Sequence, residues 1–458
     1  MPSARVIATD LGVRQAFARD ASGLELVPPA VARPATEDEV VEVLRRARAE
    51  GTPVTPAGGQ TSTTGASISD EGVLLSLRSL DRLHDIDRDR LTVRVQAGAL
   101  LGDLKRQVAA EGFLLAPDPT SEDDVTVGGA VACNASGARS LLYGATRPHV
   151  AALRVALADG TVHDLRRTRL EKNTVGYAPV HEPVDWFIGS EGTLGVILEA
   201  ELSLLPLPAL VTGLALPFTR EAEAFDFVVA ARTSPAVSPR CLEFFDGAAL
   251  AVARAAELSG HWAEGACALV YVEQVAADES GLSLDGWLSL GDRFGVVEGD
   301  ILVYDGEAAL REARRVRHAV PATMNERGAR YRAAGGRKVS TDWAVPFRQL
   351  KTVIAEARKL ASDADIEQAV IYGHAGNGHP HQNFIARDAS ELERVEAVVE
   401  ATLRHVVGQG GTVAAEHGIG KIKRRWLPLQ LSALQLDMMR AMKRELDPDG
   451  MLAPGNLF

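Results

Sequence analysis

The fold is indicated by the stretch Pro56-Ala-Gly-Gly-Gln-Thr-Ser-Thr-Thr-Gly65, which follows a short predicted strand at 52–55. Glycines without a Cβ let backbone amides approach a diphosphate, and the Gln, Thr and Ser side chains add hydrogen-bond donors. The stretch is neither a Walker A loop nor the Gly-x-Gly-x-x-Gly dinucleotide fingerprint. Taken alone, it fits an ordinary surface loop as well as it fits a phosphate-binding loop.

Two more segments rich in small residues lie in the same half of the chain, at 120–144 and at 188–197. Between the three segments, apolar patterns predict strands at 73–77, 91–96 and 197–204 and a helix at about 100–111. Ordinary folds seldom need three such close backbone approaches. Their number therefore favours a bound phosphate-containing cofactor over three unrelated loops.

The composition excludes several classes of protein. The chain has 458 residues, enough for two or three domains, and 49 basic against 61 acidic residues give a formal charge of −12. An acidic surface repels phosphate backbones, so no nucleic-acid partner is expected. No apolar run has the length of a membrane span, and no secretory signal is recognised at the start. The odd, widely spaced cysteines Cys133, Cys241 and Cys267 suit a reducing cytoplasm.

The pattern of predicted elements changes after Pro206 and Pro208. From about 211 to 410, strands such as 242–245 and 268–273 alternate with longer helices such as 309–327, which predicts an antiparallel sheet covered by helices. We therefore expect an α+β protein with three segments. Residues 1–210 would form a cofactor domain, 211–410 a cap that receives the substrate, and 411–458 a segment that returns to the first domain.

The sharpest local pattern is the histidine-rich stretch from Tyr372 to Phe384, Tyr-Gly-His-Ala-Gly-Asn-Gly-His-Pro-His-Gln-Asn-Phe. Asn377-Gly378 predicts a two-residue type I′ hairpin turn. In that register His374 stands opposite His381, at a separation that lets both imidazoles reach one metal ion. A polar surface hairpin is the alternative interpretation.

A later Glu416-His417-Gly418 supports the metal interpretation. It follows a glycine turn and a short apolar run at 413–415 that predicts a strand. A carboxylate beside a histidine is therefore expected at the end of that strand. Two His and one Glu leave coordination positions open, as a catalytic metal site requires.

The glycine segments resemble the FAD-binding domain of the vanillyl-alcohol-oxidase type, in order and in spacing, and the resemblance runs from about residue 33 to the C-terminus. Several members of that superfamily attach FAD through a histidine in the first loop. Here Gln60 occupies that place, which predicts non-covalent FAD. The resemblance implies the following FAD-contacting residues: Pro56, Ala57, Gly58, Gly59, Gln60, Thr61, Ser62, Gly65, Pro119, Thr120, Thr126, Gly128, Gly129, Asn134, Ser136, Gly137, Tyr143, Gly144, Glu191, Gly192, Gly195, Val196, Ile197 and Asn456.

The second half resembles the C-terminal half of the FAD-linked oxidases, which include D-lactate and D-2-hydroxyglutarate dehydrogenases and the glycolate oxidase flavin subunit. The resemblance implies that His374, His381 and Glu416 bind a divalent metal, with zinc expected and manganese or iron as alternatives, and that His417 is the base. Asn377 and His379 depart from the usual Asp and Asn of the family string. The departures either change the surroundings of the ligands or add a ligand.

By the same resemblance, Arg317 would hold the substrate carboxylate, and Asn383 is a further candidate catalytic residue on the histidine face. The 2-hydroxyglutarate enzymes have a Thr and a Lys where this chain has Pro321 and Ser340, and Lys338 is near but shifted. This favours a monocarboxylate over a dicarboxylate. An arginine on this helix could instead belong to a solvated basic face.

The resemblance therefore predicts FAD-dependent oxidation of a small 2-hydroxy acid, of D configuration, to the 2-oxo acid. Electrons would pass to a quinone, a cytochrome or an electron-transfer flavoprotein, and no nicotinamide site is recognised. A homodimer or a heteromeric complex is compatible with the sequence, in the cytoplasm or peripherally at the inner membrane. Three alternatives remain: a flavin-containing electron-transfer subunit, an oxidase that reduces oxygen directly, and a flavin-using transferase without net oxidation. The two-histidine hairpin and Glu416 speak against that transferase.

Overall fold

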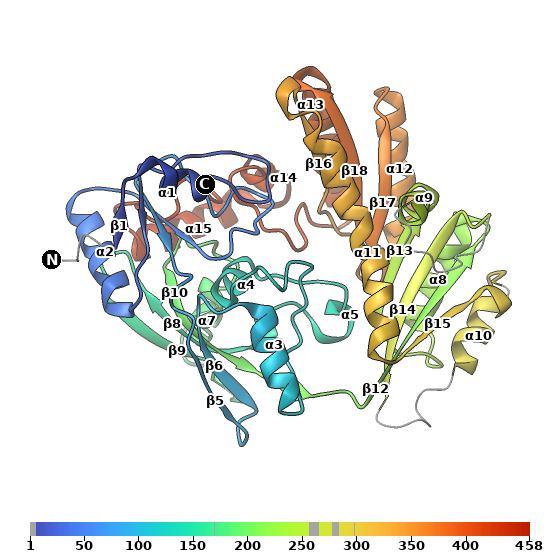
Figure 1. Cartoon of the computed structure of the whole chain (residues 1–458), viewed down its shortest axis with the longest axis horizontal. Helices are drawn as coiled ribbons and strands as arrows, with labels where there is room; N and C mark the ends of the chain where they lie inside the picture. Colours follow the sequence, from blue (N-terminus) through green and yellow to red (C-terminus); the bar gives the residue numbers. More distant parts are fainter. Residues whose placement is uncertain (1–5, 169, 256–264, 277–283, 297) are drawn as a thin grey trace. The chain divides into compact units, whose positions relative to one another are not determined.

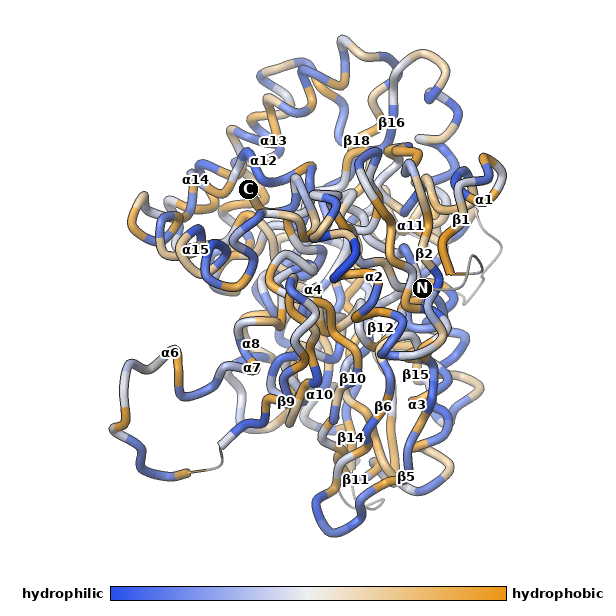
Figure 2. Tube along the Cα trace, turned by 90° about the vertical axis from the view of Figure 1, so that its left-hand side faces the viewer, coloured by the Kyte–Doolittle hydropathy of each residue, from blue (hydrophilic) through white to orange (hydrophobic). Residues whose placement is uncertain are grey.

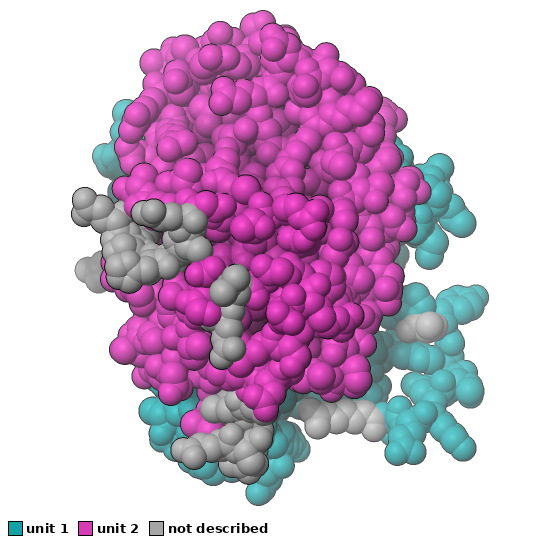
Figure 3. Space-filling model, turned by 90° about the vertical axis from the view of Figure 1, so that its right-hand side faces the viewer, with its two compact units in different colours: residues 1–136, 144–207, 416–458 teal, residues 137–143, 208–415 magenta. Residues whose placement is uncertain are grey.

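The computed structural model describes residues 6–168, 170–255, 265–276, 284–296 and 298–458. Two compact units divide the chain (Figure 3). Unit 1 consists of Met1–Ser136, Gly144–Leu207 and Glu416–Phe458, and unit 2 of Gly137–Tyr143 and Pro208–Ala415. Within the described residues, no helix is long and apolar enough to cross a membrane.

Unit 1 begins with a four-stranded sheet of order β1-β2-β4-β3, in which β4 is parallel to both β2 and β3. Its strands are β1 (Ile7–Ala8), β2 (Ala30–Ala32), β3 (Val54–Ala57) and β4 (Val73–Ser76). Helix α2 (Glu37–Ala49) begins at Thr36, whose side chain accepts a hydrogen bond from the Glu39 amide. Its apolar residues at helical spacing, Val40, Val43 and Leu44, are buried in one cluster with the strand residues Val54 and Leu75.

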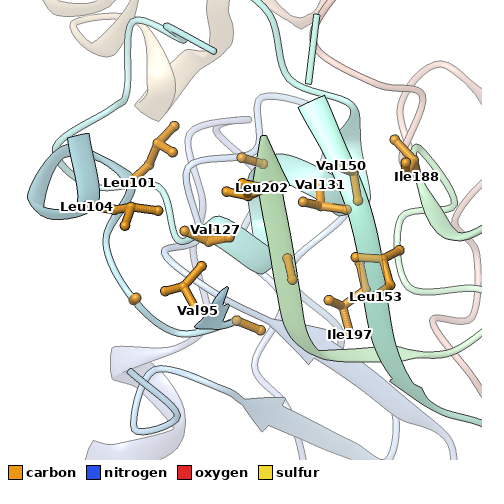
Figure 4. Packing of buried hydrophobic residues seen from close by; sticks show 14 of the residues in the cluster. Val95, Leu101, Leu104, Val127, Val131, Val150, Leu153, Ile188, Ile197 and Leu202 are labelled. Carbon is orange, nitrogen blue, oxygen red and sulfur yellow. The ribbon is translucent and has the colours of Figure 1, made fainter. Parts of the chain in front are cut away.

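The second sheet of unit 1 is antiparallel, with the order β5-β6-β10-β8-β9. Its strands are β5 (Leu83–Asp87), β6 (Thr92–Gln96), β8 (Val150–Ala156), β9 (Val162–Arg166) and β10 (Val196–Ser203). Figure 4 shows its core, where Val95, Leu153 and Leu202 pack with Val127 and Val131 of α4 (Val127–Cys133). The second and third glycine segments therefore flank a well-packed sheet, which fixes their positions.

The remaining helices and strands complete unit 1. They are α1 (Leu11–Ala16), α3 (Leu101–Ala110), β7 (Phe113–Leu114), α6 (Ala178–His181), α7 (Val184–Phe187), β11 (Leu205–Pro206), α14 (Leu427–Gln430) and α15 (Ala433–Leu446). The segment around α6 stands out from the body of the unit (Figure 2). Near its end the chain returns to the first sheet, where Leu452 forms an isolated parallel β-bridge with Val54.

Unit 2 is built on a seven-stranded antiparallel sheet of order β15-β12-β14-β13-β17-β18-β16. The strands are β12 (Leu210–Phe218), β13 (Pro239–Asp246), β14 (Ala268–Ala276), β15 (Leu302–Asp305), β16 (Gly335–Ser340), β17 (Gln368–His374) and β18 (His379–Asp388). The predicted helix-covered antiparallel sheet is confirmed.

Helices cover both faces of this sheet. The helices of unit 2 are α8 (Glu221–Thr233), α9 (Gly247–Ala255), α10 (Asp285–Asp292), α11 (Gly306–Ala329), α12 (Leu350–Asp363) and α13 (Ala389–Gly408), together with the short α5 (Ser140–Tyr143). On one face, α9 and α11 bury Phe245, Tyr271 and Tyr372, and α11 is seen running across the strands (Figure 1). On the other face, Phe225 of α8 stacks on Phe244 with ring centroids 4.5 Å apart.

Candidate functional site

The three glycine segments meet in unit 1. A Cβ at Gly58 would lie 2.1 Å from the Thr126 hydroxyl, and one at Gly59 would lie 2.0 Å from the Asp124 carbonyl oxygen. A Cβ at Gly192 would lie 3.2 Å from Pro56. Segments that are far apart in the sequence therefore lie against one another at these glycines, and a Cβ at Gly58 or Gly59 would clash with the second segment.

Gln60 holds the first segment in place. Its backbone has a positive φ of 56°, and its side-chain amide donates hydrogen bonds to the carbonyl oxygens of Phe17 (2.9 Å) and Ser67 (3.2 Å). The residue that stands where some relatives carry a flavin-linked histidine is thus used for loop structure. Non-covalent FAD stays a prediction.

Two residues expected at the FAD connect segments of unit 1. The Glu191 carboxylate accepts hydrogen bonds from the amides of Ile419 (2.5 Å) and Gly420 (2.7 Å), and burial raises the pKa of this carboxyl despite these bonds. Asn456 donates to the carbonyl oxygens of Ala66 (2.9 Å) and Glu191 (3.2 Å). The C-terminal segment that begins at Glu416 is therefore tied to the first and third glycine segments.

The second glycine segment divides between the two units. Thr126 caps α4 by accepting a hydrogen bond from Gly129, and Asn134 accepts one from the Arg147 amide (2.9 Å), both within unit 1. Gly137 and Tyr143 belong to unit 2. The remaining expected FAD residues of the segment, Pro119, Thr120, Gly128, Ser136 and Gly144, lie in unit 1.

The histidine hairpin forms, but the predicted register is wrong. His374 pairs with His379, and Tyr372 pairs with His381. The connection is a 3-10 turn over Ala375–Asn377, closed by the Gly378 amide on the Ala375 carbonyl oxygen (2.9 Å). Gly378 alone takes the left-handed conformation, with φ 69°, because its backbone packs against Val345. A two-residue type I′ turn would need positive φ at Asn377 as well.

The observed register makes His379, in place of His381, the residue opposite His374. Residues 379 and 381 share one face of β18, and His374 stands opposite His379 on that face. The ring centroids of His379 and His381 are 4.6 Å apart, and the His374 ring lies 5.3 Å from the first and 5.5 Å from the second. All three side chains are buried. Buried imidazoles in a triangle are a typical donor set for a transition-metal ion.

Glu243 of β13 orients the first of these histidines. Its Oε1 lies 2.6 Å from Nδ1 of His374, so Nε2 of that ring is left as the candidate ligand atom. Its Oε2 lies 2.8 Å from Nε of Arg317, and the carboxylate is 1% exposed. Burial alone would raise the pKa of Glu243, but Arg317 and His374 together lower it to about 2.

Arg317 reaches the same place from α11. Its Nη2 lies 3.5 Å from both ring nitrogens of His374, which places it beside the ring and not on the axis of either nitrogen. The side chain is 15% exposed. Arg317 therefore does not lie on a solvated basic face. A buried, oriented guanidinium can bind a carboxylate through two parallel hydrogen bonds.

The structure also places Asn383, Glu416 and His417. Asn383 is fully buried on β18, donates to the His381 carbonyl oxygen (3.0 Å), and its Oδ1 accepts no hydrogen bond among the described residues. Glu416 is bonded to Ala415, the last residue of unit 2, and is the first residue of the C-terminal segment of unit 1. Nε2 of His417 lies 3.3 Å from Oε1 of Glu416.

The segment before Glu416 is not the expected strand. It makes only an isolated bridge, between Ala344 and Thr412, and the Ala415 amide donates to the Asp342 carbonyl oxygen (2.7 Å). The glycine turn at 408–411 leaves too few residues to pair along a neighbouring strand. The bridge and this hydrogen bond nevertheless fix the chain at the residue before Glu416.

Sequence reasoning missed Glu243. The signal is present, because a charged residue stands in the apolar strand Cys241-Leu-Glu-Phe-Phe245, on the same face as Cys241. Charged residues are almost never fully buried without a partner, so a carboxylate in such a strand indicates a buried contact. Its partner, 131 residues away, could not be read from the sequence.

Comparison with known proteins agrees with both halves of this arrangement. Residues 28–166 match the family described as "FAD binding domain", and residues 207–457 match "FAD linked oxidases, C-terminal domain". The glycolate oxidase subunit GlcD of Bacillus subtilis is 31% identical over 94% of this chain and 89% of that protein. A D-2-hydroxyglutarate dehydrogenase of Xanthomonas citri is 32% identical, with the same two coverages.

A D-lactate dehydrogenase of Anaerostipes hadrus is 29% identical, again over 94% of this chain and 89% of its own length. Among solved structures, an alkyldihydroxyacetonephosphate synthase aligns with a TM-score of 0.72 at 18% identity, over 99% of this chain and 82% of its own. That likeness shows the fold alone and confirms the expected α+β architecture. With the glycine segments and the second-half match in agreement, the chain belongs to the FAD-linked oxidase family.

Proposed function

We propose that this protein is an FAD-dependent, metal-assisted dehydrogenase that oxidises a 2-hydroxy monocarboxylic acid, of D configuration, to the 2-oxo acid. The observation that carries the proposal is the shared carboxylate of Glu243. It contacts a potential metal ligand, His374, and an anion-binding side chain, Arg317, in one buried place. A 2-hydroxy acid fits this arrangement, because its hydroxyl group can bind a metal and its adjacent carboxylate can pair with an arginine.

The residues fit a divalent metal. His374 and His381 each have Nδ1 directed at an oxygen, of Glu243 at 2.6 Å and of Thr341 at 3.4 Å, so both rings can offer Nε2. Glu416, which is bonded to the last residue of unit 2, is the proposed carboxylate ligand. A metal held there would act as a Lewis acid toward the substrate hydroxyl. Zinc is the first candidate, with manganese or iron as alternatives.

The residues also fit FAD. In unit 1, the contacts of Gly58 and Gly59 with 124–126 bring two donor-rich segments together, and no side chain at either glycine separates them. Bound FAD would accept the hydrogen at the substrate Cα with its two electrons. The role of the chain is to hold the donor and the acceptor and to remove the hydroxyl proton.

Each protein residue then has a separate task. Arg317 would pair with the substrate carboxylate, and Glu243 would keep both Arg317 and His374 in position. His417 would accept the proton of the hydroxyl group as a general base. Asn383, with a buried carbonyl oxygen that accepts no hydrogen bond among the described residues, could accept one from the substrate.

A monocarboxylate is favoured over a dicarboxylate. In α11, Pro321 follows Arg317 by one turn and offers neither a hydroxyl nor an amide hydrogen to a second carboxylate. The nearby amine of Lys338 is committed to Asn325 at 2.8 Å. The relatives named for lactate and glycolate act on monocarboxylates, whereas those named for 2-hydroxyglutarate act on a dicarboxylate.

The electron acceptor is proposed to be a quinone, a cytochrome or an electron-transfer flavoprotein. An electron-transfer subunit without its own substrate is a second candidate. Intact candidate ligands and an intact Glu243–Arg317 pair favour the dehydrogenase, because a subunit that only relays electrons needs neither.

Replacing His417 by Ala tests the proposal. We expect kcat with an artificial electron acceptor to fall by about 10²–10⁴-fold, the usual contribution of a general base, while FAD content stays unchanged. His405→Ala is the matched control, since His405 lies on α13 outside both candidate ligand groups. Turnover of the His417 variant within a few-fold of the parent would show that His417 is not the base.

A further inference from the structure

His379 is the residue of the hairpin to which the proposed chemistry gives no task. Its side chain is buried, and Nε2 is enclosed in protein without a hydrogen-bond partner among the described residues. The nearest acidic oxygen, Oδ1 of Asp342, lies 3.2 Å away but outside hydrogen-bonding geometry. A buried polar atom left without a partner destabilises the fold, so its retention calls for an explanation.

The position of the ring supplies one. His379 is the residue directly opposite His374 in the hairpin, and its ring lies closer to His381 than His374 does. Its ligand atom lies within 4.8 Å of those of the other two histidines. Facing residues of an antiparallel pair and alternate residues of one strand share a face, so the backbone directs all three imidazoles to one point.

We propose that His379 is itself a metal ligand, so that this site offers three imidazoles and one carboxylate. The inference rests on the proposed metal site and extends it, because that site needed only His374, His381 and Glu416. Four protein ligands would complete a tetrahedral zinc ion and leave it no open position. An ion that also binds the substrate here must take five or six ligands, which Mn²⁺ and Fe²⁺ accept readily.

Asp342 gains a role in this arrangement. When one ring nitrogen of a histidine binds a metal, the other is commonly oriented by a carboxylate or a carbonyl oxygen. Asp342 is fully buried and is the acidic group next to the His379 ring. Because Oδ1 of Asp342 lies beside Nε2 of His379, Nδ1 would be the ligand atom, and a small rotation of the ring would let Nε2 donate a hydrogen bond to Asp342. Asp342 is thus assigned as the positioning residue of His379.

The test measures metal binding, independently of turnover. Flavin-loaded full-length protein is stripped with a chelator and titrated with Co²⁺ and with Zn²⁺, for the parent and for His379→Asn, His381→Asn and His405→Asn. We expect both hairpin variants to bind each ion at least tenfold more weakly. His405→Asn should bind like the parent, since His405 also has a buried Nε2 that finds no hydrogen-bond partner in the described part of the chain but lies outside the group.

X-ray absorption of the Co²⁺-loaded parent gives a second measurement that needs no variant, and the expected result is three imidazole ligands. Two imidazoles, or a His379→Asn variant with parental affinity beside a weakened His381→Asn, would overturn the proposal while the metal site itself stands. If the parent bound neither ion, or if His381→Asn had no effect on binding, both the role of His379 and the metal site of the proposed function would be wrong.

Discussion

Gly59 gives the most quantitative test of how the flavin segments are built. A Cβ at this position would lie 2.0 Å from the Asp124 carbonyl oxygen and 3.2 Å from Cα of Val125. Both neighbours are backbone atoms, so no side-chain rotation can relieve the clash. In Gly59→Ala, the first and second glycine segments must therefore move apart by roughly 1 Å or more to restore ordinary contact distances.

The expected cost follows from the general effect of overpacking. Forcing an extra methyl group into a packed site costs about 1–3 kcal/mol, and here the displaced atoms are those expected to surround the FAD diphosphate. If that cost falls on the bound state, the dissociation constant for FAD rises about 5- to 150-fold. Any part that falls on the apoprotein appears as a lower melting temperature.

The assay is a fluorescence titration of flavin-stripped protein with FAD, together with thermal unfolding of the same samples. Gly408→Ala is the matched control, because no atom lies within 4 Å of a Cβ built at Gly408 and its φ is not positive. A Gly59→Ala protein that matches this control in both FAD affinity and melting temperature would refute the reasoning.

Three further outcomes are expected. Glu273→Gln leaves the buried charges of Arg139 and Arg240 without their carboxylate, which should cost about 3–5 kcal/mol of unfolding free energy at pH 7, measured by denaturant titration. Burial alone would raise the pKa of Glu273, but these two arginines hold it well below its usual range. The stability that the Glu273 carboxylate contributes is therefore present above about pH 4.3 and is lost as the pH falls. The variant should consequently lose less stability on acidification than the parent. Glu243→Gln should weaken metal binding roughly 10- to 100-fold in the titration used for the histidine variants, and parental affinity would remove its positioning role. Arg317→Lys keeps the charge but loses the planar guanidinium, so KM for the acid should rise at least about tenfold with unchanged FAD content. An unchanged KM would exclude Arg317 as the residue that binds the substrate carboxylate.

Much of the fold could be predicted because its signals are local. The glycine segments and their spacing indicated the FAD-binding half, and alternating strands and helices indicated the covered antiparallel sheet. Helix α2 also follows from local signals, since Thr36 provides the cap and the apolar spacing provides the buried face. Each of these features depends on residues within one element.

The hairpin register could not be predicted because Asn-Gly is compatible with more than one turn. In the fold, the Gly378 carbonyl oxygen accepts a hydrogen bond from the Val345 amide (3.0 Å), a contact between distant segments that no local pattern reveals. The consequence is chemical, since the predicted register paired His374 with His381 and left His379 as an additional ligand only by one of two interpretations. The observed register makes His379 the direct neighbour of His374.

The buried partners of the site were also beyond reach of local patterns. Glu243 and Arg317 come from a strand and a helix that are 74 positions apart, and only the assembled sheet brings them to the hairpin. A charged residue in an apolar strand signals that a partner exists. Finding which residue that partner is requires the topology of the sheet.

The central claim, FAD-dependent oxidation of a 2-hydroxy acid, is tested most directly by anaerobic bleaching of the flavin in the purified protein. The panel would hold D- and L-lactate, glycolate, D-malate, D-2-hydroxyglutarate and longer or aromatic D-2-hydroxy acids. We predict rapid bleaching by a D-monocarboxylate, with neither its mirror image nor the dicarboxylates acting at a comparable rate. Protein that contains FAD and metal, yet is bleached by none of these acids, would contradict the account and favour the electron-transfer subunit.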